Sequence, residues 1–191
     1  MTTAIRCHTV AELMRRLDDA TRSRDDEVVV REVKQVLVDT LSGGALQLDP
    51  AFLVPAPDKY ARRLLHRDPR GRYTALVMVW DVGQGTRLHD HGGHWCVEGV
   101  YRGQIEVVSY SVRGGDPEQG IVQFAEETTV RAGVGQAGAL IPPFEYHLLR
   151  NAGTTPAVTI HVYSEELTSC HVFDPVDGGW RRRHVELSYT E

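Results

Sequence analysis

Three histidines are the residues of this sequence whose types and spacing point most directly to chemistry. His89 and His91 are separated by one residue, and His147 lies further along the chain. On a β-strand, side chains two positions apart point to the same side, so the first two imidazoles would face one site. Neutral imidazole is the commonest protein ligand for divalent transition metals. The three histidines therefore predict a metal site.

The residues around the histidines make the prediction more specific. A lone His-x-His pair is weak, because many strands carry histidines that face solvent or pack in a core. Here the three histidines stand in a frame of Gly83, Gly103, Pro142 and Asn151. That order resembles the two motifs of the cupins, which are β-barrel proteins. The usual cupin has a glutamate ligand where this sequence has Cys96. Three histidines with that glutamate replaced by cysteine resemble the cysteine dioxygenases.

Composition limits the class of protein and its partners. The chain has 191 residues and a net charge of −5, so a single domain is expected and nothing favours binding to nucleic acid or an anionic membrane. No apolar run approaches the roughly 20 residues of a membrane span, and no secretory signal is expected. The three cysteines form no disulfide framework, which is typical of a reducing compartment. A cytoplasmic monomer or weak homo-oligomer is predicted.

The pattern along the chain predicts a small helical cap followed by a β-barrel. Thr9 to Glu12 is a capping box that begins a helix ending near Ser23, and a second helix is expected over 26–41. From residue 60 onward, short β-rich runs alternate with turn residues. The predicted strands are 73–80, 97–101, 105–112, 121–124, 158–163 and 182–187. The expected fold is therefore mostly β, a cupin jelly roll in one domain over 1–191, with a cap at 1–45 and the barrel at 58–191. Hairpin turns are expected at Arg102-Gly103 and at 177–179.

Four stretches carry the resemblance to cysteine dioxygenases in more detail. They are Tyr60-Ala-Arg62, the segment from Leu88 to Cys96, Tyr146-His147 with Asn151, and the segment from Thr159 to Tyr163 followed by Cys170-His-Val-Phe-Asp174. The resemblance implies an Fe(II) ion held by His89, His91 and His147. It implies that Arg62, together with Tyr60, binds the substrate carboxylate. It also implies a catalytic relay of Thr159, His161 and Tyr163, and a thioether cross-link between Cys96 and Tyr163.

The chemistry of such a site is consistent with a thiol substrate. Three neutral ligands leave the full charge of a divalent ion uncompensated, which suits an anionic thiolate, and metal binding deprotonates a coordinating thiol. Iron can supply one-electron chemistry toward dioxygen, whereas zinc has no redox chemistry. A planar guanidinium matches a carboxylate with two parallel bonds. On an alternating strand only one of Arg62 and Arg63 can share a face with Tyr60, and the resemblance selects Arg62.

The leading hypothesis is an iron-dependent dioxygenase that converts L-cysteine and O2 to cysteine sulfinate. One alternative keeps the chemistry and changes the thiol, for example to 3-mercaptopropionate. Another is a metal-dependent cupin isomerase or hydrolase with Glu98 as a fourth ligand, and a third is a cupin that only binds a ligand. The chain departs from the family at Glu165-Glu166, where two prolines are common. A cis peptide is not expected there, because without proline it costs about 3 kcal/mol.

Overall fold

The computed structural model describes residues 7–143 and 146–191, and in these residues it has two α-helices and two five-stranded sheets. The helices are α1 (Val10–Ala20) and α2 (Asp26–Ser42), and a short 3-10 helix covers Pro50–Leu53. The first sheet has the order β1 (Ala61–Arg67), β2 (Thr74–Trp80), β8 (Ala157–Tyr163), β3 (Cys96–Arg102) and β6 (Ala137–Leu140). The second has the order β7 (His147–Asn151), β4 (Gln104–Asp116), β5 (Gln119–Gly133), β10 (Gly179–Glu186) and β9 (Ser169–Val176). The predicted fold class, mostly β with N-terminal helices, is confirmed.

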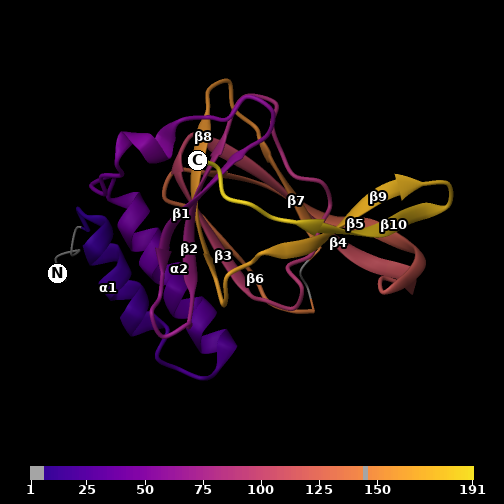
Figure 1. The fold of residues 1–191 in the computed structure, drawn as a ribbon, viewed down its shortest axis with the longest axis horizontal. Helices are drawn as coiled ribbons and strands as arrows, with labels where there is room; N and C mark the ends of the chain where they lie inside the picture. Colours follow the sequence, from indigo (N-terminus) through magenta and orange to yellow (C-terminus); the bar gives the residue numbers. More distant parts are fainter. Residues whose placement is uncertain (1–6, 144–145) are drawn as a thin grey trace.

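Both helices begin where capping residues place them. The Thr9 side chain accepts a hydrogen bond from the backbone N–H of Glu12, and Asp25 does the same for two N–H groups of α2. These bonds satisfy donors that have no partner inside the helix. Figure 1 shows the two helices side by side on one sheet, with the hairpins of the second sheet extending away from them. No helix among the described residues is long and apolar enough to cross a membrane.

Two inner strands of the first sheet, β2 and β8, are buried on both faces, which explains why most of their residues are apolar. Successive side chains of a strand point to opposite faces. In β2, Val77 and Val79 pack toward the helices in the main core, whereas Met78 and Trp80 point into the barrel. In β8, Ile160 and its outward neighbours pack under the helices, and all seven residues are buried. The inward positions of β8 carry the buried polar residues Thr159 and His161.

The turn at Arg102-Gly103 is not a hairpin, contrary to the prediction. β3 pairs with β6 and β8, whereas β4 pairs with β5 and β7, so the turn carries the chain from one sheet to the other. Gly103 has φ +77°, and a Cβ atom there would lie 2.9 Å from the Cα of Ala157. Glycine suits this corner because it tolerates a positive φ and a close backbone approach. The predicted hairpin at 177–179 is confirmed, since β9 and β10 pair across it.

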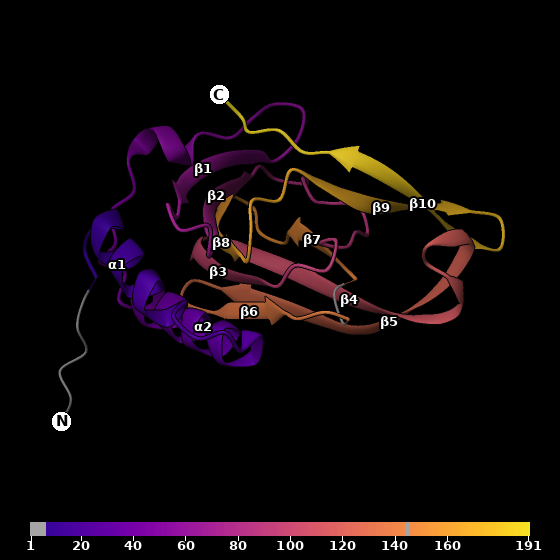
Figure 2. The ribbon, with the colours of Figure 1, turned by 60° about the horizontal axis from the view of Figure 1, so that its bottom comes forward.

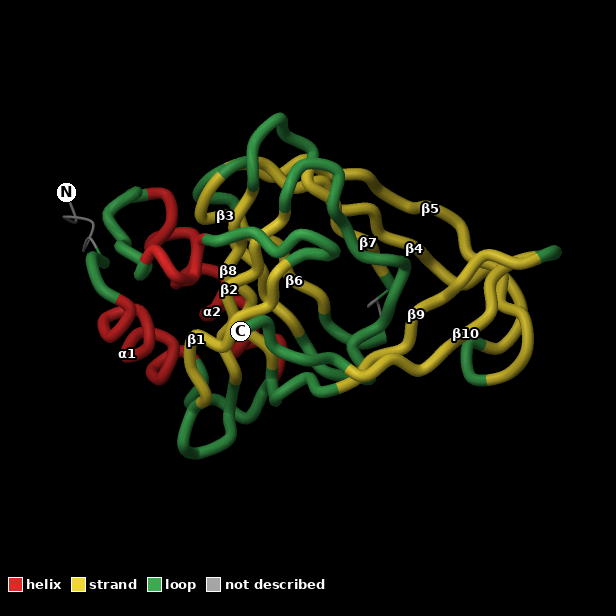
Figure 3. The backbone as a smooth tube through the Cα atoms, turned by 45° about the horizontal axis from the view of Figure 1, so that its top comes forward, coloured by secondary structure: helices red, strands yellow, loops and turns green. Residues whose placement is uncertain are grey.

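The strand predictions were incomplete where the strands are polar or short. The strand predicted at 121–124 extends over Gln119–Gly133, because an exposed acidic and threonine-rich stretch continues the pairing with β4. The strands β6, β7 and β9 were not predicted. Figure 2 shows β9 and β10 lying opposite the β4–β5 hairpin at the end of the molecule away from the helices. Figure 3 shows the long loops that join the strands near the barrel centre.

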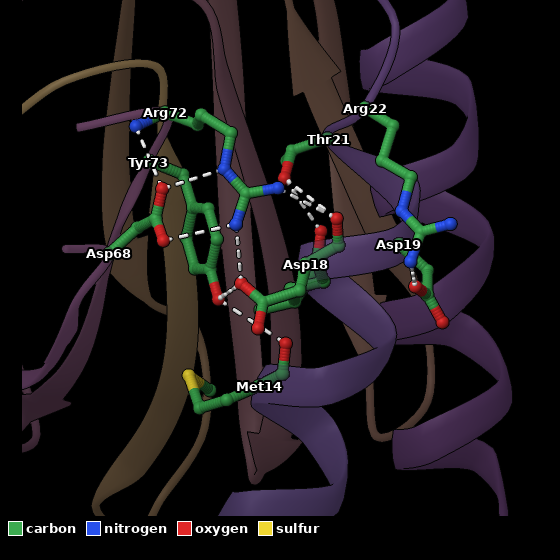
Figure 4. Close-up of polar contacts among 9 residues, drawn as sticks. Met14, Asp18, Asp19, Thr21, Arg22, Asp68, Arg72 and Tyr73 are labelled. Carbon is green, nitrogen blue, oxygen red and sulfur yellow. Dashed lines mark hydrogen bonds and ion pairs between the residues drawn. The ribbon is translucent and has the colours of Figure 1, made fainter. Parts of the chain in front are cut away.

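A polar network joins α1 to the turn between β1 and β2 (Figure 4). The Arg72 guanidinium donates to both carboxylate oxygens of Asp68, at 2.7 and 3.0 Å, and to the Asp18 carboxylate at 2.7 Å. The Tyr73 hydroxyl donates to Asp18 and to the carbonyl of Met14. Asp68 is buried, and its bonds to Arg72 lower the pKa of its carboxyl to about 2. The network therefore holds the helical cap to the barrel.

Replacing Asp68 with asparagine is expected to lower the free energy of unfolding at pH 7 by about 1–3 kcal/mol, because charged bonds to Arg72 are lost. The folded carboxyl has the lower pKa, so its contribution is complete above the ordinary value near 4 and is lost as the pH falls through about 2. Urea unfolding of both proteins in chelator, at pH 7 and at pH 3, measures this. A difference between the proteins that does not shrink at pH 3 would contradict the assignment.

Candidate metal centre

The structure brings the three predicted metal ligands together inside the barrel. Each histidine contributes one ring nitrogen, and these nitrogens of His89, His91 and His147 all lie within 4.8 Å of one another. The Nε2 atoms of His91 and His147 are 3.3 Å apart, and both side chains are buried. Two ligands at right angles on an ion, each about 2.1 Å from it, would be about 3 Å apart. The spacing therefore fits a single transition-metal ion.

His89 sits between the two edge strands of the second sheet. Its backbone N–H donates to the carbonyl of His147 on β7 at 3.0 Å, and its carbonyl accepts from the N–H of His147 at 3.2 Å. It also forms a bridge with Val172 on β9. β7 and β9 are the outer strands of that sheet, so this segment links its two edges around the site. The ring Nδ1 of His89 faces the carbonyl of Arg87 at 3.0 Å, which leaves Nε2 for a metal.

Asp90 fixes the segment between the two ligands. Its carboxylate accepts hydrogen bonds from the backbone N–H of His171 at 3.0 Å and of Gly92 at 3.2 Å, and it lies 3.2 Å from the ring Nδ1 of His171. The Asp90 carboxylate therefore faces His171 on β9. The carboxylate thus ties the ligand segment to β9 without joining the ligand set.

His89 and His91 do not lie on a regular strand, which corrects the prediction. His89 forms only isolated bridges, and His91 is followed by a turn at Gly92 and Gly93, whose φ angles are +62° and +85°. These left-handed conformations favour glycine. The turn reverses the chain into Cys96 at the start of β3. Of the second histidine motif, residues 144–145 lie outside the described residues.

The electrostatics of the site favour metal binding. Burial lowers the pKa of His89 and lowers that of His91 and His147 well below the ordinary value. For the latter two, neighbouring histidines add to the effect. All three imidazoles are therefore neutral at physiological pH, which is the form that binds metal. A set of three neutral nitrogen donors without a carboxylate suits a divalent transition-metal ion.

The predicted relay residues share the inner face of β8. The indole N–H of Trp80 donates to Thr159 Oγ1 at 2.9 Å, and Thr159 Oγ1 lies 2.8 Å from His161 Nε2. Indole can only donate, so the hydroxyl proton of Thr159 is free to bond Nε2. That bond favours the His161 tautomer with its proton on Nδ1, which lies 3.3 Å from the Tyr163 hydroxyl. The Tyr163 proton can then point into the cavity.

His161 acts in this arrangement as a neutral group. Burial, followed by the positive charge of Arg62, lowers the pKa of His161 to about 3. Burial also raises the pKa of Tyr163 well above its usual value, so the phenol keeps its proton. A neutral imidazole beside a protonated phenol can orient the hydroxyl and exchange a proton with it. The sequence analysis did not predict that Trp80 bonds to Thr159, and its place at the end of an apolar strand was the available sign that it is buried.

Cys96 and Tyr163 are direct cross-strand partners. They face each other in the antiparallel pair of β3 and β8, and both are buried. Opposite residues of such a pair have Cβ atoms about 4.5–5.5 Å apart, which places the thiol beside the phenol ring. Burial raises the pKa of the Cys96 thiol well above its usual value, with the Glu98 carboxylate adding to the effect. The pairing supports the cross-link that the resemblance implies.

Arg62 and Tyr60 both line the cavity that contains the histidines, and Arg63 does not. Arg62 is buried, and its guanidinium donates to the carbonyl of Leu167 and lies 4.9 Å from the centre of the Tyr189 ring. The alternation predicted for this strand therefore agrees with the structure. Cys170 lines the same cavity, and burial raises its pKa to about 11, so it remains a thiol.

The residues that replace the family's prolines take part in this region. Glu166 is bonded to Arg67 on β1, and its carboxylate accepts from the Tyr189 hydroxyl at 2.7 Å. Tyr189 in turn packs against the Arg62 guanidinium. The cis peptide found among the described residues is Pro142–Pro143, so none precedes Glu165, as expected. Sequence reasoning did not identify Tyr189 or Leu167 as neighbours of the site.

Glu98 is not placed with the three histidines. Its carboxylate groups with Cys96 and His161, and Oε2 lies 3.6 Å from His161 Nδ1. Burial raises the pKa of Glu98 to about 8, which keeps the carboxyl neutral at pH 7. The alternative function that uses Glu98 as a fourth metal ligand would therefore require the side chain to move.

Comparison with known proteins addresses the family directly. The family model described as cysteine dioxygenase type I matches residues 1–176. The chain belongs to the cysteine dioxygenase type I family. Cysteine dioxygenase type 1 of Rattus norvegicus is 28% identical over 182 residues, covering 93% of this chain and 84% of that protein. The Homo sapiens protein of the same name is 24% identical with the same coverage.

Among solved structures, similarity is lower. An uncharacterized conserved protein with a double-stranded β-helix domain from Klebsiella pneumoniae subsp. pneumoniae MGH 78578 has a TM-score of 0.45 and 19% identity, covering 61% of this chain and 85% of that chain. Membership of the cysteine dioxygenase type I family, and through it of the cupin superfamily, confirms the resemblance inferred from the motifs. The roles of individual residues remain predictions.

Proposed function

We propose that this protein is an Fe(II)-dependent dioxygenase that oxidises L-cysteine with O2 to cysteine sulfinate. The observation that carries the proposal is the composition of one cavity. Three neutral histidines face a wall that contains Arg62, and Tyr163 faces them from β8. The cysteine dioxygenase type I family supplies the substrate class, because its rat and human members are named for cysteine.

His89, His91 and His147 would hold the iron, which when bound supplies one-electron chemistry toward dioxygen and favours the thiolate form of the substrate. The protein's own residues position the substrate. Arg62 binds the carboxylate, exchanging its bond to the carbonyl of Leu167 for one to the substrate. Tyr163, oriented by His161, donates its hydroxyl proton toward the reacting thiol.

The shape of the cavity also favours a small substrate. Its volume is about 30 Å³, room for only about two water molecules, so even cysteine would require the side chains around it to shift and a larger substrate would require more. The mostly buried walls exclude water, which strengthens each electrostatic contact inside. These features support cysteine or another small thiol carrying a carboxylate.

The test is metal analysis followed by oxygen uptake with several thiols. Protein purified and loaded with iron should hold one ion per chain, and cysteine should give faster uptake than 3-mercaptopropionate or cysteamine. Cysteine offers an amine as well as a thiolate, whereas 3-mercaptopropionate leaves one iron position to water. Faster oxidation of 3-mercaptopropionate would keep the thiol dioxygenase chemistry and refute the cysteine assignment. No uptake with any thiol by the iron-loaded protein would refute both.

A cross-link between Cys96 and Tyr163 is expected to form during turnover, because the two residues are opposite each other on β3 and β8. A carbon–sulfur bond would form as the thiol and a ring carbon each lose hydrogen, with dioxygen accepting the electrons. Intact mass and peptide mapping should show a fraction that has lost two hydrogens, with the two peptides joined. Cys96→Ser protein should show no such fraction and retain some activity. Only unlinked chain after many turnovers would contradict this.

A further inference from the structure

A second, larger cavity lies between the two sheets beside the metal centre. Its volume is about 260 Å³. The lining is mainly apolar and includes Val100, Ile105, Val107, Ala132, Leu140 and Leu149. We call it the inter-sheet cavity. The polar residues Glu98, Ser109, Gln136 and Thr159 complete the lining. The apolar part of such a cavity can take up small apolar molecules such as xenon.

Only one layer of side chains separates the inter-sheet cavity from the metal centre. Glu98 and Leu149 line both the inter-sheet cavity and the cavity that contains the three histidines. Thr159 also lines the inter-sheet cavity, and it is hydrogen-bonded to His161, which lines the other. A molecule in the inter-sheet cavity would therefore be next to the site of reaction.

The absence of a side chain at Gly138 leaves room at the end of the inter-sheet cavity nearest the metal centre. Gly138 on β6 is paired with Glu98 on β3, and Figure 2 shows these two strands running side by side over α2. A Cβ atom built on Gly138 would meet Glu98 at 3.8 Å, which is ordinary contact. Glu98 is a neutral carboxyl at pH 7, so no charge faces the inter-sheet cavity here. A methyl group at Gly138 would fit, and a valine there would extend into the space beside Glu98.

The lining also reaches the surface. Val130 on β5 contributes to the inter-sheet cavity and is 55% exposed to solvent. The cavity thus extends from solvent, near β5 and β6, to the wall of the metal centre.

We propose that the inter-sheet cavity is the binding site and route by which dioxygen reaches the metal centre, with Glu98 and Gly138 forming its inner end. The inference rests on the proposed dioxygenase function, because that reaction needs an apolar gas as its second substrate. The two substrates have opposite requirements. A thiol with a carboxylate needs the charge of Arg62, which lies in the histidine cavity and does not line the inter-sheet cavity. Dioxygen is apolar and partitions into apolar space, and it needs a path that the bound thiol does not fill.

The test uses Gly138→Val in the full-length, iron-loaded protein, with Gly133→Val as the matched control. Gly133 does not itself line the inter-sheet cavity. A Cβ there would meet only the Gln136 side chain, a lining residue, at 3.9 Å, an ordinary contact that leaves Gln136 in place. Oxygen uptake measured over a range of O2 concentrations should give a KM for O2 several-fold higher in Gly138→Val. The KM for the thiol, kcat at saturating O2 and iron content should match wild type. Gly133→Val should be unchanged in all four.

Xenon provides a readout that does not depend on activity. Crystals of the wild-type protein under xenon pressure should show xenon between Val107, Gly138 and Leu149, and crystals of Gly138→Val should not. No xenon there in wild type would overturn the proposal, as would an unchanged KM for O2 or a rise in the thiol KM alone. If Gly138→Val does not fold, Ala132→Leu fills the same cavity and should give the same result. Absence of any thiol-dependent uptake in wild type would instead refute the proposed function.

Discussion

Replacing His147 with alanine is expected to abolish both iron retention and thiol-dependent oxygen uptake. His147 is fully buried, and its Nε2 lies 3.3 Å from that of His91, so its loss removes one of three ligands and opens a hole in the site. Two histidines and water would hold a divalent ion far more weakly than three preorganised imidazoles. Iron content by elemental analysis and uptake by an oxygen electrode measure the two effects.

His184 provides the matched control for this substitution. It lies on β10, its side chain is 54% exposed, and it is not among the three histidines of the site. His184→Ala should retain the iron content and activity of the wild type. If His147→Ala kept full iron and full activity, the metal centre would be wrongly assigned, whatever the behaviour of the control.

Replacing Arg62 with alanine is expected to reduce kcat/KM for cysteine by an amount equivalent to about 2–5 kcal/mol, the scale for losing one member of a buried charged pair. Arg62 is buried and lines the cavity of the three histidines, so no solvent can substitute for it. Cysteamine lacks a carboxylate, and its rate should already be low and should barely change. Steady-state oxygen uptake with both thiols gives the comparison.

Arg63 offers the neighbouring control. It follows Arg62 on β1 but does not line the cavity, so Arg63→Ala should leave the ratio of cysteine to cysteamine oxidation unchanged. A neutral Arg62→Ala together with an impaired Arg63→Ala would mean that the substrate pocket is wrongly drawn. That result would leave the proposed thiol dioxygenase chemistry intact and would refute the proposed position of the substrate carboxylate.

Local patterns were sufficient to predict the elements that are stabilised locally. The cap of α1 at Thr9 depends on residues three positions apart, and the apolar runs of β2 and β8 follow from burial on both faces. Strands such as β7 were missed because their pairing depends on partners far along the chain. The turn at Gly103 was misread for the same reason, since a glycine corner looks alike whether it joins paired strands or changes sheets.

The candidate ligands could likewise be predicted from the sequence, because each of the two motifs that contain His89, His91 and His147 is short enough to be recognised. The residues that surround these ligands in the folded protein could not be predicted. The pairing of Glu98 with Gly138 and His161 arises where β3, β6 and β8 meet in register. The contact of Tyr189 with Arg62 joins the two ends of the barrel sequence. Only the folded chain decides such neighbours, because they depend on long-range register, and a shift of one residue would turn each side chain to the other face.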